Sequence, residues 1–302
     1  MSINYRTATQ IMILRILDPV QKHLLVTTLV LVIGTGCTNM LYSATSNMAS
    51  NLSYAMLNHD DLDTIKGAAP AYLLMADGLL QDYPNDINLL TATSEMYNAY
   101  ANVFVSEPQR AKRLTQRAFE YAERAACLQN VIACNWRKQS FINFQSNLQQ
   151  LTKDDVPVFF TLGASWAGWI QARSNDWNAV ADLPRVTEIM QRIIELDETY
   201  QQGAAHLYLA VADTMLPPSL GGKPEIGRQH FEDAIRLSHG RNLIVKVLYA
   251  RQYARLVFNR ELYVNLLTDV INADPVAPDL TLMNMVAQQQ AKQLLADTDK
   301  YF

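Results

Sequence analysis

Apolar residues recur every three to four positions along most of this chain, the spacing that places them on one face of an α-helix. Short polar stretches separate the apolar segments, so consecutive helices should pack as antiparallel hairpins. The pattern predicts an all-α protein of about eleven helices. We expect these helices at 63–82, 86–105, 107–128, 130–151, 156–173, 183–196, 199–216, 224–238, 241–258, 260–273 and 279–297.

Two of these helices begin with recognisable signals. Ser106 and Gln109 have the spacing of a capping box at the start of the helix at 107–128. Pro157 opens the helix at 156–173, because proline is favoured in the first turn, where its missing N–H is not needed.

Short antiparallel helix pairs suggest a comparison with tetratricopeptide (TPR) repeats. The first helix of a TPR repeat carries a small residue that lets the second helix approach. This spacing is matched by Phe159, Leu162, Gly163 and Trp166. A second repeat helix matches the small residues Ala118, Ala122 and Ala125. No segment carries the full repeat, so we expect an irregular α-solenoid of degenerate TPR-like hairpins. An irregular helical bundle would use the same core residues.

One segment interrupts the helical pattern with several helix breakers. Within eight positions it holds Pro217, Pro218, Gly221, Gly222 and Pro224. Prolines end a helix, and glycines allow backbone angles that other residues avoid. We expect a structured loop that forms one wall of a groove or one side of a subunit contact. In the alternative interpretation, the glycines only permit a tight crossing between two helices.

The N-terminus resembles a signal sequence. The apolar run 24–33 is too short to cross a bilayer, but it suits a signal-peptide core. Cys37 follows small residues and is the expected lipidation site, although Gly34 stands where a lipoprotein signal usually has a larger residue. A plain secretory signal or a short membrane anchor is the alternative.

These features predict three parts of the chain: a lipoprotein-type signal peptide at 1–36, a tether at 37–55 and a single helical TPR-like domain at 56–302. The true start of translation is either Met1 or Met12.

Composition limits the classes of partner. The chain of 302 residues is 49% hydrophobic and 18% charged, with a formal net charge of −4. It has no basic block and no interleaved aromatic and basic residues, so we expect no nucleic acid as a partner.

The sequence shows no catalytic or metal-binding motif. Four histidines outside the N-terminal segment lack the spacing of metal ligands, and no nucleophile or phosphate-binding motif accompanies them: His59, His206, His230 and His239. We expect His206 and His230 to be packed or capping residues. The chain should be neither an enzyme nor a cofactor or metal protein.

The pair Cys127 and Cys134 allows two interpretations. On one continuous helix the two residues would lie about 10 Å apart, which is too far for a disulfide. If Gln129 and Asn130 form the turn of a helical hairpin, an exported protein can oxidise them. Both interpretations are open from the sequence.

A few residues are candidates for binding. Trp169 either packs in the core or lines a groove, and packing is favoured. Arg251 and Arg255 lie four positions apart, where an arginine pair can clamp a carboxylate. The alternative, which we favour, is a solvated face whose arginines pair with Glu232 or Asp233.

The segment 206–255 resembles the TatT family, the T component associated with tripartite ATP-independent periplasmic (TRAP) transporters. The resemblance rests on Leu216-Pro217-Pro218, Gly221-Gly222, His230-Phe231-Glu232, Ala234 and Gly240-Arg241-Asn242. Residues 259–275 and 282–302 also look like the end of that family. The likeness is clear over 155–302, and residues 60–150 agree only in helical character.

The resemblance implies a helical fold with cryptic TPR-like hairpins, a lipid anchor facing the periplasm and assembly as a homotrimer. It also implies docking of a TRAP solute-binding protein and the handling of small organic-acid or hydrophobic ligands. An outer-membrane location is mildly preferred. Candidate ligand or partner residues are Tyr208, Leu216, Pro217, Pro218, Gly221, Gly222, Asn242, Arg251, Arg255 and Trp169. The runner-up function is a general TPR-like envelope lipoprotein that binds proteins and has no transport role.

Overall fold

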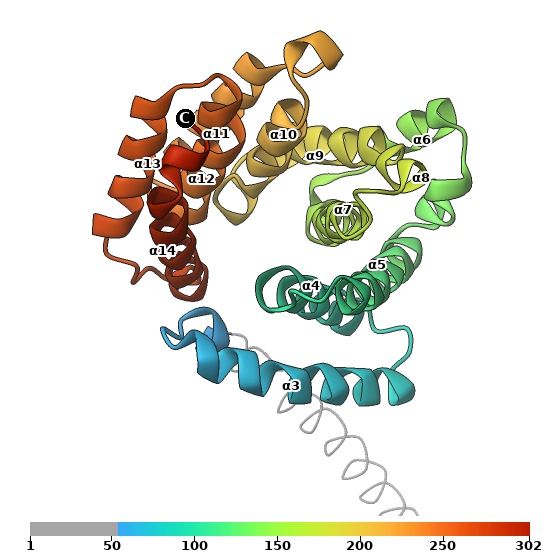
Figure 1. Ribbon diagram of the computed structural model, residues 1–302. Helices are drawn as coiled ribbons and strands as arrows, with labels where there is room; N and C mark the ends of the chain where they lie inside the picture. Colours follow the sequence, from blue (N-terminus) through green and yellow to red (C-terminus); the bar gives the residue numbers. More distant parts are fainter. Residues whose placement is uncertain (1–53) are drawn as a thin grey trace, which may run out of the picture. The chain divides into compact units, whose positions relative to one another are not determined.

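The computed structural model describes residues 54–302, and within this range the chain is helical and contains no strand. Figure 1 shows the arrangement of the helices. The α-helices are α3 (Leu62–Asp82), α4 (Ile87–Phe104), α5 (Pro108–Gln129), α6 (Phe141–Leu148), α7 (Val156–Gln171), α8 (Trp177–Val180), α9 (Leu183–Asp197), α10 (Ala204–Thr214), α11 (Pro224–Leu237), α12 (Leu243–Leu248), α13 (Arg260–Asn272) and α14 (Thr281–Ala296). The all-α prediction is therefore confirmed.

The residues of the expected signal peptide, 1–36, lie outside the described range, and so do Cys37 and both candidate start sites. Residues Leu57–Phe302 form one compact unit. In the part of the chain that the structure describes, no helix combines the length and hydrophobicity needed to cross a bilayer.

Neighbouring helices pack in chain order, and the two ends of the compact unit meet. Helix α4 packs on α5, α5 on α7, α7 on α9, α9 on α10 and α10 on α11. The side chain of Asn58, before α3, donates to Oδ1 of Asp279 (3.3 Å), and the backbone N–H of Asp279, before α14, donates back to Asn58 Oδ1 (2.9 Å). The chain thus curls until α14 approaches α3 (Figure 1).

Two clusters of buried side chains form the core. The first lies among helices α3 to α10 and contains Phe119, Phe159 and Trp166, each at most 1% exposed. The second joins α10 to the C-terminal helices, with Phe231 and Tyr263 at its centre. Burial of large side chains on one face of each helix stabilises the hairpins far more than helix propensity does.

The small residues predicted to permit close helix contacts do so. A Cβ atom at Gly163 of α7 would lie 2.7 Å from Met190 Cε and 3.1 Å from Ile189 Cγ2 of α9. The alanines of α5 at 118, 122 and 125 are at most 1% exposed. The repeat-like spacing thus reports real close packing, while the solenoid interpretation itself stays a prediction.

The continuous helix expected at 130–151 is wrong. Helix α5 ends at Gln129, and the chain then forms two 3₁₀ turns, η1 (Val131–Ala133) and η2 (Trp136–Lys138), before the short α6. The Oδ1 atom of Asn130 accepts the N–H of Ile132, and Asn135 has a left-handed φ of 62°. Asparagine side chains compete with the helical backbone in this way, and the apolar spacing concealed that effect.

Two other helix boundaries differ from prediction. The cap of α5 is Glu107 rather than Ser106, because its carboxylate accepts the N–H groups of Gln109 (2.8 Å) and Arg110 (2.7 Å). Helix α10 starts at Ala204 rather than near 199, because the three residues before it have positive φ, namely Gln201, Gln202 and Gly203. The helix expected at 241–258 consists of α12 and a π-helical turn, η6 (Tyr249–Ala254).

Candidate functional site

The connection between α10 and α11, here called the 215–223 loop, has a defined conformation. The N–H of Gly221 donates to the carbonyl of Pro218, and the N–H of Gly222 donates to the carbonyl of Pro217, both at 3.1 Å. The N–H of Lys223 donates to the carbonyl of Asp213 at 2.9 Å and closes the loop. Figure 1 shows the loop at the edge of the molecule. Backbone hydrogen bonds thus hold it in place.

Both glycines of this loop are required by the backbone. Gly221 has a φ of +91°, a backbone angle that residues other than glycine rarely adopt. At Gly222 a Cβ atom would overlap the backbone carbonyl of Leu216. The two glycines are therefore needed by the loop's own backbone, and a binding role has to rest on other residues.

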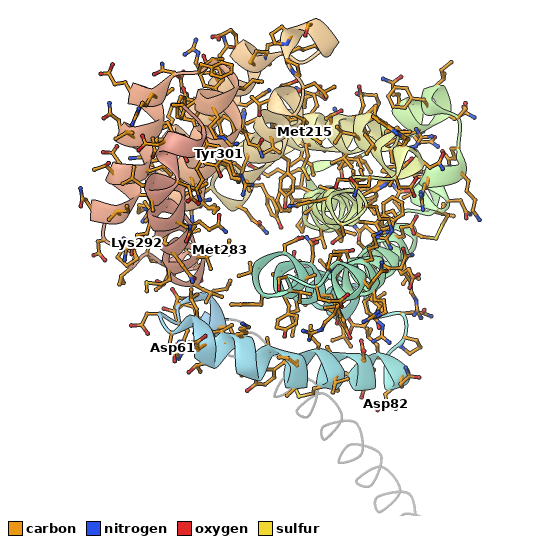
Figure 2. All side chains as sticks on the ribbon, in the orientation of Figure 1. Asp61, Asp82, Met215, Met283, Lys292 and Tyr301 are labelled. Atoms are coloured by element: carbon orange, nitrogen blue, oxygen red, sulfur yellow. A yellow bond between two sulfur atoms is a disulfide. The ribbon has the colours of Figure 1, made fainter. Side chains whose placement is uncertain are left out.

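The loop end of this hairpin exposes large apolar side chains. Met215, Leu216 and Ile226 are 45%, 49% and 44% exposed, and we call these three residues the apolar patch. Met215 is labelled in Figure 2. Because the loop closes between Asp213 and Lys223, residues 215 and 226 lie at the same end of the hairpin. Exposed apolar groups on a fixed loop are typical of protein contacts.

Tyr208 belongs to a second group of residues, which we call the Glu95 cluster: Glu95, Phe160, Thr161, Tyr200 and Tyr208. The Phe160 ring meets Tyr200 and Tyr208 edge-on, with centroid distances of 5.3 and 5.8 Å. The Thr161 hydroxyl donates to Glu95 Oε1 at 2.6 Å. The cluster therefore joins α4, α7, α10 and the 3₁₀ turn η4 (Tyr200–Gln202).

The surrounding protein raises the pKa of two groups in the cluster. Glu95 is exposed to solvent, yet dehydration by the surrounding protein raises its pKa. Dehydration and then the charge of Glu95 raise the pKa of the half-buried Tyr208 to about 12.

Arg251 is a half-buried cation without a partner. Among the described residues its side chain makes no hydrogen bond, ion pair or ring contact. Dehydration and the neighbouring Arg255 lower its pKa. The guanidinium of Arg255 itself stacks on Tyr301, 3.5 Å from the ring centroid. Arg255 thus has an aromatic partner, whereas the Arg251 side chain has none among the described residues.

The acids that we favoured as partners of this arginine pair are engaged elsewhere. Glu232 Oε1 accepts from Arg228 at 2.7 Å, and Asp233 Oδ1 accepts from Arg236 at 2.8 Å. That interpretation is therefore wrong: neither Arg251 nor Arg255 has an ion pair with these residues.

Trp169 and Asn242 lie away from the loop contacts. Trp169 is 5% exposed, its Nε1 donates to Gln116 Oε1 at 2.6 Å, and its ring lies between Arg137 and Arg173. It is a core residue with little surface to offer a ligand. Asn242 begins α12, and its buried Oδ1 has no hydrogen-bond partner in the described range.

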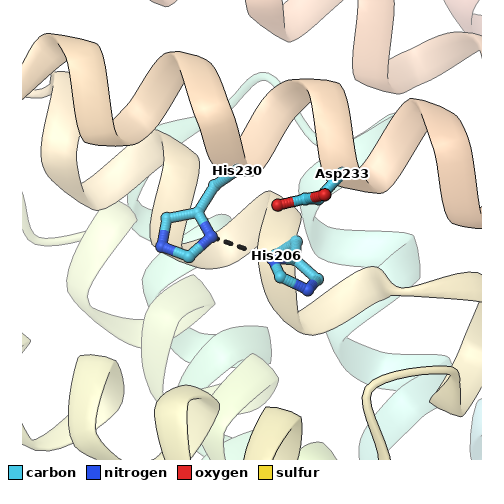
Figure 3. A group of neighbouring side chains, drawn as sticks. All are labelled: His206, His230 and Asp233. Atoms are coloured by element: carbon cyan, nitrogen blue, oxygen red, sulfur yellow. Dashed lines mark hydrogen bonds between the residues drawn. The ribbon is translucent and has the colours of Figure 1, made fainter.

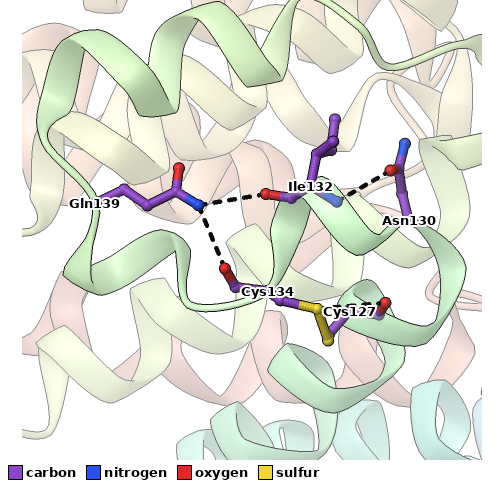
Figure 4. The surroundings of a disulfide bond; sticks show 5 residues. All are labelled: Cys127, Asn130, Ile132, Cys134 and Gln139. Atoms are coloured by element: carbon purple, nitrogen blue, oxygen red, sulfur yellow. Dashed lines mark hydrogen bonds between the residues drawn. A yellow bond between two sulfur atoms is a disulfide. The ribbon is translucent and has the colours of Figure 1, made fainter.

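Cys127 and Cys134 form a disulfide (Figure 4). The bridge requires a turn between the two cysteines, and the chain does turn after α5 ends at Gln129. The two Cα atoms are therefore 4.5 Å apart. The side-chain amide of Gln139 donates to the carbonyls of Ile132 (3.4 Å) and Cys134 (3.3 Å) and ties down the segment after the bridge.

Sequence reasoning missed Glu95, Phe160 and Tyr200. They come from three segments far apart along the chain, and none stands in a motif. The available signal was weak: a glutamate in an otherwise apolar and small-residue helix, and two aromatic residues at helix starts.

Comparison with known proteins identifies the family. The model of the TRAP transporter T-component family matches residues 58–302. A protein of Treponema pallidum (strain Nichols), described as uncharacterized, is 24% identical over 265 residues, which cover 80% of this chain and 81% of the relative. The family match spans the whole compact unit, including the 215–223 loop and the Glu95 cluster. The chain therefore belongs to the family of TRAP transporter T-components.

Proposed function

We propose that this chain is the periplasm-facing lipoprotein scaffold of a TRAP transporter system and that it docks the solute-binding subunit through the apolar patch. The observation that carries the proposal is the exposure of Met215, Leu216 and Ile226 on a loop whose backbone is fixed. Membership of the T-component family supplies the transport context.

The geometry of the loop favours binding for an energetic reason. A flexible loop would lose conformational entropy on association, whereas a loop already ordered by its own hydrogen bonds loses little. Burial of large apolar side chains then contributes to the free energy of association. A few such residues usually account for most of the binding energy of an interface. The two prolines further restrict the unbound loop.

The proposal includes a small ligand with an acidic group. Arg251 is half-buried, dehydrated and unpaired, so a carboxylate would gain a charge-assisted hydrogen bond there without displacing an existing partner. The aromatic rings of the Glu95 cluster are the second candidate site, for an apolar ligand. No described contact joins Arg251 to this cluster, so the two are treated as separate candidate sites.

Lipid attachment at Cys37, an outer-membrane location and assembly as a homotrimer complete the proposal. Replacing Cys37 by serine should move the protein from the membrane fraction to the soluble fraction. Light scattering on the detergent-purified chain should give three times the protomer mass. A detergent-corrected monomer mass would contradict the trimer.

The docking step is tested with the purified chain and the solute-binding protein of the same transporter. Light scattering of the mixture should show a complex, and the variant Met215→Ser/Leu216→Ser/Ile226→Ser should not form it. The matched control is Val276→Ser, since Val276 is 69% exposed elsewhere. A complex that survives the triple substitution would contradict docking through the patch. If the unmodified chain forms no complex, the general envelope scaffold becomes the better description.

A further inference from the structure

His206 and His230, which are 24 residues apart, face each other across the α10–α11 hairpin. Their Nδ1 atoms are 2.8 Å apart. Asp233 lies one turn along α11 from His230, and each of the three residues offers one ligand atom within 4.8 Å of the other two. Figure 3 shows the two rings and the carboxylate converging between the helices. From the sequence, both histidines were expected to be packed or capping residues.

We propose that His206, His230 and Asp233 form a binding site for a divalent transition-metal ion such as Zn²⁺. The donors are two imidazole nitrogens and one carboxylate oxygen, a set that such ions prefer and that Mg²⁺ and Ca²⁺ do not. Three protein ligands leave a fourth position for water or for a group from another molecule.

The distances require only small movements for binding. With Zn–N bonds of about 2.0–2.1 Å and tetrahedral angles, two bound nitrogens are about 3.3 Å apart. The observed 2.8 Å between the Nδ1 atoms is slightly shorter, so a tilt of either ring admits the ion. Asp233 Oδ1 is held by Arg236, while Oδ2 accepts no hydrogen bond in the described part of the chain and is available to a metal.

Neighbouring groups hold the ligands as metal sites require. The side chain of His206 is only 5% exposed, and its Nε2 faces Glu198 Oε1 at 3.3 Å. This contact lacks the geometry of a hydrogen bond, so Nε2 of His206 has no hydrogen-bond partner among the described residues. A carboxylate behind a ligating imidazole fixes its tautomer and increases its basicity. Arg236 links Glu198 to Asp233 and orients both carboxylates.

The protonation states are compatible with binding. In the hydrogen-bonded histidine pair, one Nδ1 carries a proton and donates it to the other. With its proton on Nε2, toward Glu198, His206 has a lone pair on Nδ1, and the shared proton then belongs to His230. Metal binding then needs only a shift of that proton from Nδ1 to Nε2 of His230. No redox step and no co-reactant is involved.

The test is metal titration of the full chain, purified in detergent and stripped with a chelator. Calorimetry with Zn²⁺ should give one site per chain, and Co²⁺ should give the visible absorption of a low-symmetry site with nitrogen and oxygen ligands. The variants His206→Gln, His230→Gln and Asp233→Asn should each lose this binding. The variant Glu198→Gln should weaken it by about 10–100-fold, as loss of an outer partner does.

Controls separate a metal site from a packing pair. His239→Gln alters an exposed histidine just after the same helix and should leave Zn²⁺ binding unchanged. Circular dichroism with chelator present identifies variants that fail to fold. Asp233→Asn alters a half-buried residue and should disturb the fold least. Zn²⁺ should raise the Tm of the unmodified chain and not that of folded Asp233→Asn. No stoichiometric Zn²⁺ binding, or binding that survives all three ligand substitutions, would overturn the proposal.

Discussion

The backbone carbonyl of Leu216 fills the space that a side chain at Gly222 would occupy. This contact is between main-chain atoms, so no rotation of a side chain can relieve it. The position of Gly222 is therefore determined by the return of the chain after Pro217 and Pro218, and any larger residue has to open the loop.

We predict that Gly222→Val distorts the 215–223 loop and lowers the affinity for the solute-binding protein by at least about tenfold. The loss of global stability should be smaller, because the loop lies at the exposed end of a hairpin. Calorimetric titration and thermal unfolding measure the two effects. The control Gly78→Ala adds a Cβ in open space within α3 and should stabilise by up to about 1 kcal/mol. A large stability loss with intact binding would contradict the prediction.

Gly163 gives a prediction for the core. The substitution Gly163→Val should destabilise the chain by about 1–3 kcal/mol, because its side chain must displace Met190 and Ile189 of α9. Denaturant unfolding measures the change. If Gly163→Val unfolds at the same denaturant concentration as the unmodified chain, the close contact of α7 with α9 is not under packing pressure.

Arg251 should behave unlike a structural arginine. The substitution Arg251→Gln removes a dehydrated charge beside Arg255 and breaks no ion pair, so stability should stay equal or rise slightly. Binding of a small dicarboxylate should be lost in the same variant. Arg117→Gln is the contrast, since Arg117 pairs with Asp77 at 2.8 Å, and it should destabilise. Equal destabilisation by both changes would show that Arg251 has a structural role.

Asp77 of α3 is hydrogen-bonded to tyrosines of α4 and α5. From these contacts we predict a loss of stability at alkaline pH. The Asp77 carboxylate accepts from the hydroxyls of Tyr97 (2.6 Å) and Tyr121 (2.8 Å). Burial and then the hydrogen bond to Asp77 raise the pKa of both tyrosines above the usual 10.0. The unfolded chain therefore loses these protons first.

The contribution of these two tyrosines to stability should consequently be fully present below about pH 10 and be lost as the pH rises above it. Denaturant unfolding at several pH values between about 9 and 11 measures the slope. The double variant Tyr97→Phe/Tyr121→Phe should flatten this part of the curve. An unchanged slope in that variant would assign the alkaline loss to other groups.

The disulfide should contribute measurably to stability. It closes a short loop with a sequence separation of 7, for which the chain-entropy model gives about 2.5 kcal/mol. Reduction of the unmodified chain should lower the free energy of unfolding by about this amount. The variant Cys127→Ala/Cys134→Ala should not respond to reductant. If mass spectrometry shows full reduction and the unfolding curve does not move, the bridge does not stabilise the fold.

Much of the fold was predictable because helices depend on neighbouring residues. The segments at 62–82, 156–171 and 183–197 follow from apolar spacing, and Pro157 marks a start at nearly the right residue. The breakdown of 130–151 was not predicted, because Asn130 and Asn135 act through side-chain and backbone conformations that leave the apolar spacing intact.

The candidate sites were predictable only in part. The 215–223 loop was visible in the sequence, because prolines and glycines dictate local backbone angles whatever surrounds them. The isolation of Arg251 was not visible, since the acids expected as its partners pair with Arg228 and Arg236 in the folded chain.

The sequence alone determined the helical class and the place of the loop, whereas the need for glycine at 221 and 222 appears only in the structure. Only the tertiary structure decided that His206 meets His230, that Glu95 lies among Phe160, Tyr200 and Tyr208, and that Cys127 reaches Cys134. The physical reason is the distance along the chain between the interacting residues. Hydrogen bonds along a helix join residues four apart, whereas these encounters depend on how whole helices dock, which small residues such as Gly163 permit.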